Sequence, residues 1–177
     1  MRQPSFTASL AVPFGWNRAA GAGLSFRPIS ETDLPFLARL YASTRSGEIA
    51  LWPWTDQQKA SFLDQQFRAR QAHYHRYYDK AEWLLMIHAG ADIGRLTIER
   101  RPDEHCIIDI ALLPAHRGQG LGAALLRDLI DEAAAAGKTV SLHVEKSNPA
   151  MRLYGRLGFK SEEDNGVHER MRWSPPG

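Results

Sequence analysis

The chain of 177 residues has the length of one ordinary domain and is long enough to bury a hydrophobic core. Hydrophobic residues make up 44% and charged residues 24%, which excludes a disordered chain, and no apolar stretch approaches the roughly 20 residues of a membrane span. A formal net charge of +2 gives no broad positive surface for nucleic acid. We therefore expect a cytoplasmic protein with neither a membrane nor a nucleic-acid partner.

The single cysteine and the N-terminal residues add to this expectation. Cys106 excludes an internal disulfide, suits a reducing compartment and is interpreted as a buried thiol on a strand. Residues 1–23 hold no long apolar core followed by a small-residue cleavage site, so we interpret them as an N-terminal extension without required order. The domain itself is expected to span residues 24–173.

The first half of the domain is predicted to contain one strand and two helices. Residues 24–30 alternate apolar and polar side chains, and a helix is predicted to follow over 31–45. Gly47 and Pro53 are expected to break the chain at 46–55, before a long helix that opens at Asp56. One stripe of that helix indicates core packing, and it consists of Leu63, Phe67, Arg70, Tyr74 and Tyr78.

The second half is predicted to begin with a meander of three strands, and a helix, a strand, a short helix and a hairpin follow. The predicted ranges are strands 82–90, 92–100 and 106–114, helix 121–136 before Gly137, strand 138–145, a helix within 147–158 and a final hairpin up to residue 173. This order of elements predicts one domain of α/β (α+β) class.

The stretch LLPAHRGQGLGAALLRDLI, residues 112–130, runs from a strand end through a turn with three glycines into an apolar-periodic helix. Unpaired N–H groups and the helix dipole make such a helix start a site for anions. Gly118, Gly120 and Gly122 would let backbone amides approach a bulky diphosphate, and His116 and Arg117 add side-chain donors. The sequence therefore predicts a phosphate-binding turn.

Two known phosphate-binding motifs are alternatives for this turn, the phosphate loop and the dinucleotide fingerprint. The phosphate loop of nucleotide triphosphatases requires a Gly-Lys-Ser/Thr ending, which is absent here. The dinucleotide fingerprint is satisfied literally by Gly118, Gly120 and Ala123, and Glu145 ends the next strand. Three strands precede the strand that leads into the turn, however, and only about 30 residues follow Glu145, too few for the βα units of a dinucleotide fold.

A second motif, NPAMRLYGRLGF at 148–159, lies downstream of the turn. Together with Pro114 and the R-x-x-G-x-G pattern of Arg117, Gly120 and Gly122, it resembles the GNAT superfamily of acyl-CoA-dependent N-acetyltransferases. The resemblance covers residues 24–173 and is strongest over 106–159. It implies a single domain with a mixed, mostly antiparallel sheet of about six or seven strands, about four helices, and a splay between strands 106–113 and 139–145.

The resemblance also implies acetyl-CoA as co-substrate and no metal. Its pyrophosphate would lie on the turn and its pantetheine arm in the splay, where Asn148 would bind it. The implied cofactor-binding residues are Leu112, Leu113, Arg117, Gly118, Gln119, Gly120, Leu121, Gly122, Ala123, Asn148 and Tyr154. A backbone N–H at the strand end would polarise the thioester carbonyl, and Tyr154 would protonate the leaving thiolate as general acid.

The acceptor amine must be neutral to attack directly in a ternary complex, so a base or a water relay is expected. Asp109 and Glu99 are the leading candidates, and Asp109 is conspicuous because it interrupts an apolar strand. A hydrogen bond from a neighbouring arginine would explain Asp109 equally well. Glu145, His143, or a backbone carbonyl with water remain further candidates.

The resemblance places acceptor recognition at the first two helices, their connection and the last strands. Trp52 and Trp54 stand in that connection, and Glu48 could attract a cationic amine. His73 and His75 point in different directions on their helix, which argues against a metal site. The expected acceptor is a small-molecule or peptide amine, and the expected protein is a monomer or homodimer.

Two other functions remain open from the sequence. A domain that binds CoA as a sensor or partner module would show binding without turnover. A dinucleotide-binding oxidoreductase is less favoured, because Asn148 and Tyr154 have no role in that reading.

Overall fold

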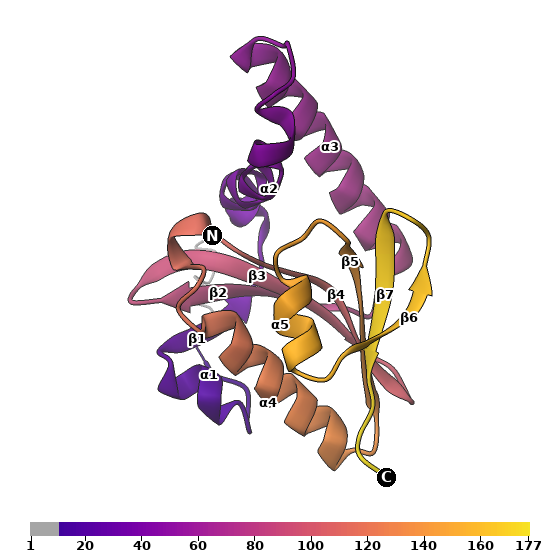
Figure 1. Cartoon of the computed structure of the whole chain (residues 1–177). Coiled ribbons are helices and arrows are strands. Elements are labelled where there is room, and N and C mark those ends of the chain that lie inside the picture. The colour runs from indigo at the N-terminus through magenta and orange to yellow at the C-terminus, as the bar shows by residue number, and fades with distance from the viewer. Residues whose placement is uncertain (1–10) are drawn as a thin grey trace.

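Residues 11–177 are described by the computed structural model, which is shown in Figure 1. The elements in chain order are α1 (Asn17–Gly21), β1 (Leu24–Pro28), the 3-10 turn η1 (Glu31–Asp33), α2 (Leu34–Ile49), α3 (Asp56–Tyr77), β2 (Glu82–His88), β3 (Ala91–Arg100), β4 (Glu104–Leu112), the 3-10 turn η2 (Pro114–His116), α4 (Leu121–Ala135), β5 (Thr139–Glu145), α5 (Met151–Arg156), β6 (Lys160–Asp164) and β7 (His168–Trp173).

The strands form one seven-stranded sheet in the order β1-β2-β3-β4-β5-β7-β6. Neighbouring strands are antiparallel except β4 and β5, which run parallel on either side of the helical crossover through α4. This confirms the expected α/β class and the mixed, mostly antiparallel sheet. The described residues include five α-helices, against about four expected.

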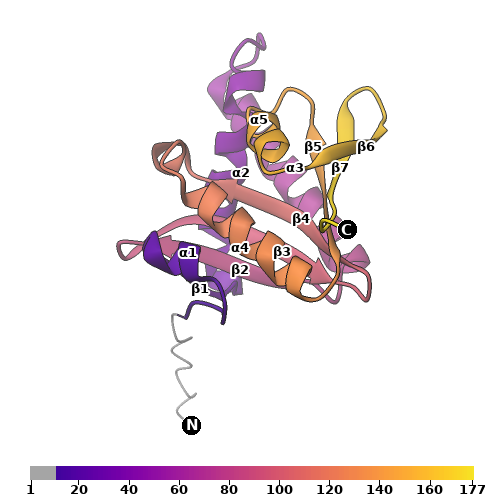
Figure 2. The same ribbon diagram turned by 60° about the horizontal axis from the view of Figure 1, so that its bottom comes forward.

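Helices cover both faces of the sheet. Helices α1 and α4 lie on one face, and α2 and α3 lie on the other (Figures 1 and 2). The larger hydrophobic cluster lies under α4, where Leu125, Leu126 and Leu129 are almost completely buried. A smaller cluster packs Leu37 and Leu40 of α2 against the sheet. Because α2 and α3 cover only part of their face, polar side chains from β3 and β4 can line a hollow beneath them.

The connection between α2 and α3 differs from the predicted break. Helix α2 continues through Gly47 to Ile49, because Arg45 and Glu48 form an ion pair one turn apart and the Ala50 N–H still donates to Ser46. A glycine in a helix costs only about 1 kcal/mol, so the prediction that the helix breaks at Gly47 was wrong. Helix α3 begins at Asp56 as predicted, with Thr55 as its N-cap.

Residues 11–23 pack against the domain. Ala11 pairs with Phe26 of β1, and Trp16 and Ala19 are buried beside α4. The carboxylate of Asp128 on α4 accepts a hydrogen bond from the Ala19 N–H at 2.8 Å. The described part of the expected extension therefore contributes to the core, and residues 1–10 lie outside the described part of the chain.

Candidate active site

The strands β4 and β5 separate part-way along their length. Their parallel pairing ends at Ile107 and Leu142, although β4 continues to Leu112 and β5 to Glu145. The expected splay between strands 106–113 and 139–145 is thus confirmed. Helix α5 lies beside this opening in both views (Figures 1 and 2).

The glycine turn connects the end of β4 to α4. Gly118 and Gly120 have φ values of 71° and 79°, a backbone region that side chains other than glycine rarely enter. Gly120 is the N-cap of α4 and no side chain caps the helix. Within residues 11–177, no hydrogen bond uses the N–H groups of residues 118–123 as donors. These donors, together with the dipole of a fifteen-residue helix, suit a phosphate group.

Gly122 shows that the turn has space for a ligand. Its φ is ordinary, and a Cβ built there would meet only the Cδ1 atom of Leu112, at 3.9 Å. Neither backbone strain nor protein packing therefore requires glycine at this position. The absence of a side chain keeps open the approach to the N–H groups of the first turn of α4.

Side chains of the turn fold back on the protein. Arg117 donates from Nε to the Leu112 carbonyl at 2.9 Å, and Gln119 donates from Nε2 to the Ala115 carbonyl at 3.0 Å. These two bonds fix the turn while leaving its backbone N–H groups free to point outward. Arg117 keeps its terminal nitrogens for an anion, because only Nε is used among the described residues.

The end of β4 offers fewer backbone groups to a pantetheine arm than expected. The Leu113 N–H donates to Ile93 at 2.8 Å, and the Leu113 carbonyl accepts from His116 at 2.9 Å. Since bonding directions alternate along a strand, the Leu112 N–H points to the other side, towards the opening. The Leu112 N–H can therefore donate to a ligand at the opening, whereas the Leu113 N–H is already used.

Asn148 lies in the turn between β5 and α5. Its Oδ1 accepts from the Ala150 N–H at 2.9 Å, so the side chain helps to start α5. The side-chain NH2 group makes no hydrogen bond within the described residues and is exposed. It can therefore donate to a ligand at the opening.

Tyr154 projects from α5 into the core beside the opening, where its side chain is 5% exposed and packs on Phe159. Its hydroxyl makes no hydrogen bond to residues 11–177. Burial, and to a smaller extent the charge of Asp109, raise the pKa of Tyr154 to about 12. The phenol is therefore protonated at neutral pH and available as a donor.

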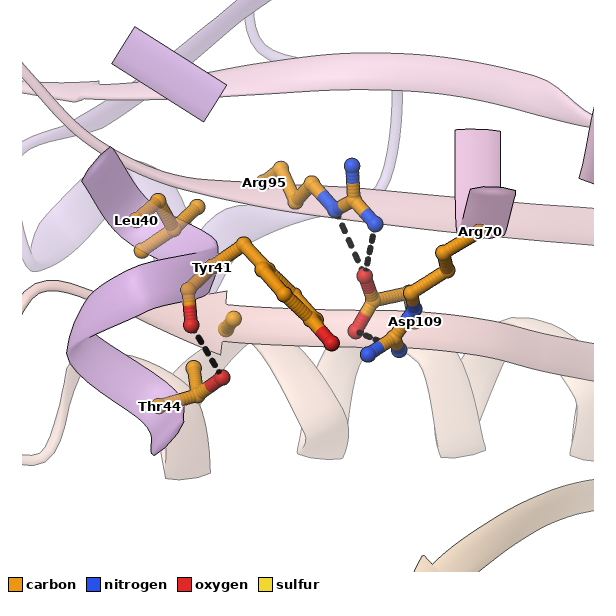
Figure 3. A pocket seen from close by; sticks show the side chains of 7 residues that line it. Leu40, Tyr41, Thr44, Arg70, Arg95 and Asp109 are labelled. Carbon is orange, nitrogen blue, oxygen red and sulfur yellow. Dashed lines mark hydrogen bonds and ion pairs between the residues drawn. The ribbon is translucent and has the colours of Figure 1, made fainter. Parts of the chain in front are cut away.

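Asp109 lies on the separated part of β4, facing α2 and α3. It accepts a hydrogen bond from Arg95 Nε at 2.5 Å, and Arg70 Nη2 lies 3.4 Å from its Oδ1 (Figure 3). Burial alone would raise the pKa of Asp109, but the charges of Arg95 and Arg70 outweigh it and hold the pKa below its usual range. A carboxylate held by two guanidinium groups is a weak proton acceptor.

The other candidate bases lie elsewhere. Glu99 is opposite Cys106, where β4 is still paired with β5, and it accepts from Arg101 Nε at 2.9 Å. Glu145 is exposed and lies 3.6 Å from His168. His143 is the first residue of β5 beyond its pairing with β4, and partial burial together with the charge of Arg170 lowers its pKa. A neutral imidazole at the opening can accept a proton.

The predicted recognition residues of the α2–α3 connection form a separate cluster. Trp52 and Trp54 contact each other and Phe62, with ring centroids 5.0 to 5.4 Å apart, at the tip of the hairpin that projects beyond the sheet (Figure 1). Neither lines the hollow beside Asp109. Glu48 already accepts from Arg45 at 2.8 Å, which reduces its capacity to attract an amine.

Three residues of the hollow beside Asp109 are not identified as site residues by the sequence pattern: Arg70, which the pattern places on a packing stripe, Arg95 and Tyr41. Arg95 is 3% exposed on β3, and Tyr41 of α2 lines the hollow together with Arg70. An arginine in the middle of the apolar strand DIGRLTIER, near a strand that carries Asp109, was the signal that could have identified them.

A mixed sheet that opens beside a glycine turn at the start of a helix is the arrangement that the resemblance to GNAT-type N-acetyltransferases implies. A model of the acetyltransferase (GNAT) family matches residues 39–159, more than half of the chain, and the chain belongs to this family.

Curated relatives match over shorter stretches. The [ribosomal protein bS18]-alanine N-acetyltransferase of Haemophilus influenzae is 36% identical over 77 residues, which cover 43% of this chain and 53% of that protein. The mouse cysteine-rich protein 2-binding protein is 46% identical over 70 residues, 40% of this chain and 9% of that protein. The chain thus spans about half or less of the length of these relatives.

Solved structures match over most of the chain. PaiA N-acetyltransferase from Thermoplasma acidophilum in complex with coenzyme A has a TM-score of 0.64 at 16% identity, covering 85% of this chain and 98% of that one. The Escherichia coli ribosomal-protein-S18-alanine N-acetyltransferase has a TM-score of 0.52 at 25% identity, covering 86% and 93%. In residues 11–177, no helix combines the length and apolar character needed to cross a membrane.

Proposed function

We propose that the protein transfers an acetyl group from acetyl-CoA to the amine of a small molecule or peptide. The observation that carries this proposal is the unpaired row of N–H groups at residues 118–123, next to a strand opening at which Tyr154 presents an unpaired phenol. Membership of the GNAT family and partial relatives named as bS18-alanine N-acetyltransferases support an amine acceptor.

The donor would be held by backbone groups more than by side chains. The N–H groups of residues 118–123 and the terminal nitrogens of Arg117 would bind the pyrophosphate, and the Leu112 N–H and Asn148 amide would bind the pantetheine arm. Acetyl-CoA supplies an acyl carbon activated as a thioester. The open space at Gly122 fits such a bulky group, because no described residue fills it.

Tyr154 would stabilise the leaving sulfur by donating a hydrogen bond. A pKa of about 12 lies well above the roughly 8.5 of an ordinary thiol, so complete proton transfer to a thiolate is uphill. A hydrogen bond to the developing negative charge still lowers the barrier, because it strengthens as the charge forms. Tyr154 is then a hydrogen-bond donor to the transition state, and the proton that the amine loses reaches the CoA thiolate through solvent.

The acceptor amine has to lose a proton, and His143 is the candidate that fits this task best. Its pKa is lowered, so the imidazole is neutral at pH 7, and it lies one residue beyond the last β4–β5 pair. Asp109 remains a candidate, but its arginine partners favour a positioning role. A water relayed to a backbone carbonyl is the third route.

Calorimetry with acetyl-CoA and a thiol-release assay over a panel of amines test the proposal. We expect binding in the micromolar range, CoA release with at least one amine, and an acetylated product by mass spectrometry. Binding without release from any amine would favour a CoA-binding module. No heat with acetyl-CoA, together with binding of a nicotinamide dinucleotide, would overturn the assignment.

A further inference from the structure

The cluster beneath α2 and α3 holds more positive than negative charge. In the described residues Asp109 is the only carboxylate within ion-pair distance of Arg95 or Arg70. The side chains of Asp109 and Arg95 are 12% and 4% exposed, so these charges are largely removed from water. One carboxylate against two guanidinium groups leaves a net charge of +1 in the cluster. The Arg70 side chain is 34% exposed, so an anion from solvent can reach the cluster.

Arg95 has its partners within the protein. It contacts Asp109 through Nε and Nη2, and its Nη1 donates to Gln71 Oε1 at 3.0 Å. Gln71 is neutral and buried, so it satisfies a donor without adding negative charge. The surplus charge of the cluster therefore belongs to Arg70.

Arg70 is held in place but only partly bonded. Its Nε donates to the Tyr74 hydroxyl at 2.8 Å, and its guanidinium lies 5.6 Å from the ring centroid of Tyr41 and 5.0 Å from that of Tyr74. Nη2 is an ion-pair partner of Asp109 at 3.4 Å, and neither terminal nitrogen makes a hydrogen bond within residues 11–177. Nη1 thus has no partner among the described residues and Nη2 has only a loose contact with Asp109, so the guanidinium fork keeps N–H donors for a further carboxylate.

The fork faces a hollow beside the proposed reaction site. Leu40, Tyr41 and Thr44 of α2 form one wall, and Arg70, Arg95, Asp109 and Ala111 complete it (Figure 3). Asp109 and Ala111 both lie beyond Ile107, on the part of β4 that has separated from β5. The hollow therefore borders the opening on the face opposite α4.

We propose that this hollow binds a carboxylate of the acceptor, with Arg70 as the residue that selects it. The inference rests on the proposed function and narrows it to amines whose molecule also carries a carboxylate, such as an amino acid or an acidic peptide. Asp109 and the rings of Tyr41 and Tyr74 hold the guanidinium in place before the acceptor arrives. Arg95 alone would be enough to pair with Asp109 for structural reasons, so Arg70 is available for a ligand.

Matched acceptor pairs test this selectivity in a thiol-release assay at saturating acetyl-CoA. Each pair differs only in the carboxylate: β-alanine against β-alaninamide, glycine against glycinamide, and the peptides Ala-Glu-Ala amide against Ala-Gln-Ala amide. The amino-acid pairs test a free amino acid as the source of the carboxylate, and the peptide pair tests the side chain of an acidic peptide. We expect kcat/KM to be at least tenfold higher for the carboxylate in the preferred pair.

Variants of α3 assign this preference to Arg70. Arg70→Gln should reduce the ratio within the preferred pair to about one, because kcat/KM falls much more for the carboxylate than for the amide, and Arg70→Lys should restore part of the ratio. Arg68→Gln, at a 78% exposed position of the same helix, is the matched control and should leave the ratio intact. Equal use of both members in every pair, or equal loss for both in Arg70→Gln, would overturn the proposal.

A binding measurement separates this inference from the proposed function. The Arg Nε–H signals of the protein are followed by NMR during titration with propionate or propionamide at constant ionic strength. A saturable shift that only propionate produces, and that is lost in Arg70→Gln, supports the carboxylate site even if no amine is acetylated. Identical responses to propionate and propionamide would reject the site even if acetyl transfer is observed.

Discussion

Asp109 on β4 accepts a hydrogen bond from Arg95 on β3 at 2.5 Å, in the part of the sheet where β4 has left β5. The two side chains belong to neighbouring strands and point to the same face, towards α2 and α3. Because Arg95 is almost completely buried, this carboxylate is the charge that makes its burial tolerable. Asp109 therefore has a structural task that a catalytic base does not need.

Replacement of Asp109 by Asn tests whether Asp109 acts mainly as the charge partner of Arg95 or as the catalytic base. The amide keeps the shape but leaves Arg95 without a charged partner, so we expect the free energy of unfolding to fall by about 3 kcal/mol or more in urea denaturation. Turnover, measured where the variant is still folded, should fall less than tenfold. A loss of turnover of about 10² or more at nearly unchanged stability would instead identify Asp109 as the base.

Asp33 provides the control for Asp109 and a pH prediction of its own. Two hydrogen bonds of 2.7 Å from Arg27 lower the pKa of Asp33 from 3.8 to about 2. Because the folded pKa is the lower one, this stabilisation is present above about pH 4 and is lost as the pH falls towards 2. Asp33→Asn should remove that part of the acid transition, followed by circular dichroism, and leave turnover unchanged.

Local patterns in the sequence were sufficient for most of the fold. Period-two alternation identified β1, and apolar runs between turn signals identified β2, β3 and β4. The apolar periodicity between Gly120 and Gly137 identified α4 to within a residue. Gly118 and Gly120 were correctly identified as turn glycines, because the ability to adopt a positive φ comes from glycine itself and not from its tertiary contacts. The resemblance added the splay, which depends on two strands that are more than 30 residues apart.

Properties that depend on tertiary contacts could not be predicted in this way. Arg70 falls on the inward stripe of α3, and only the position of Asp109 turns that packing residue into a charged wall of the hollow. The backbone groups of Leu113 bond to Ile93 and His116, which no local pattern indicates. Trp52 and Trp54 are aromatic loop residues, but the length of α2 and α3 carries them to the hairpin tip.

Substitutions in the glycine turn should separate ligand binding from stability. Gly122→Ala has no backbone strain and one ordinary contact, so stability should stay the same or rise by up to about 1 kcal/mol. Affinity for CoA, measured by calorimetry, should fall at least tenfold, because the methyl group enters the space in front of the free N–H groups. Unchanged CoA affinity would move the pyrophosphate away from this turn.

The matched control for this turn lies at the other end of α4. Gly120→Ala and Gly137→Ala both force alanine into positive φ, at 79° and 66°, and each should cost about 1–2 kcal/mol of stability. Only Gly120→Ala should weaken CoA binding. Equal loss of CoA affinity in the two variants would mean that binding follows global stability rather than the local backbone.

Tyr154→Phe should lower turnover without affecting donor binding. The hydroxyl has no partner among the described residues, so we expect the free energy of unfolding to change by less than about 0.5 kcal/mol. Loss of the donor to the leaving sulfur should reduce kcat by about 10²-fold, with CoA affinity unchanged. The reduction should be constant from pH 7 to 9, because the phenol titrates at about 12. An unchanged kcat would remove Tyr154 from the mechanism.

Trp16→Ala tests whether residues 11–23 are an integral part of the domain. Trp16 is 1% exposed, packs edge-on against Phe26 with centroids 5.1 Å apart, and donates from Nε1 to Glu132 at 2.8 Å. Its removal should cost about 3–5 kcal/mol in chemical denaturation. Trp54→Ala, at a position 41% exposed on the hairpin tip, should cost less than about 1 kcal/mol. If Trp16→Ala and Trp54→Ala lowered the free energy of unfolding equally, the segment before β1 would contribute little to the stability of the domain. A much larger loss in Trp16→Ala would show that this segment is an integral part of the layer formed with α4, the helix that follows the glycine turn.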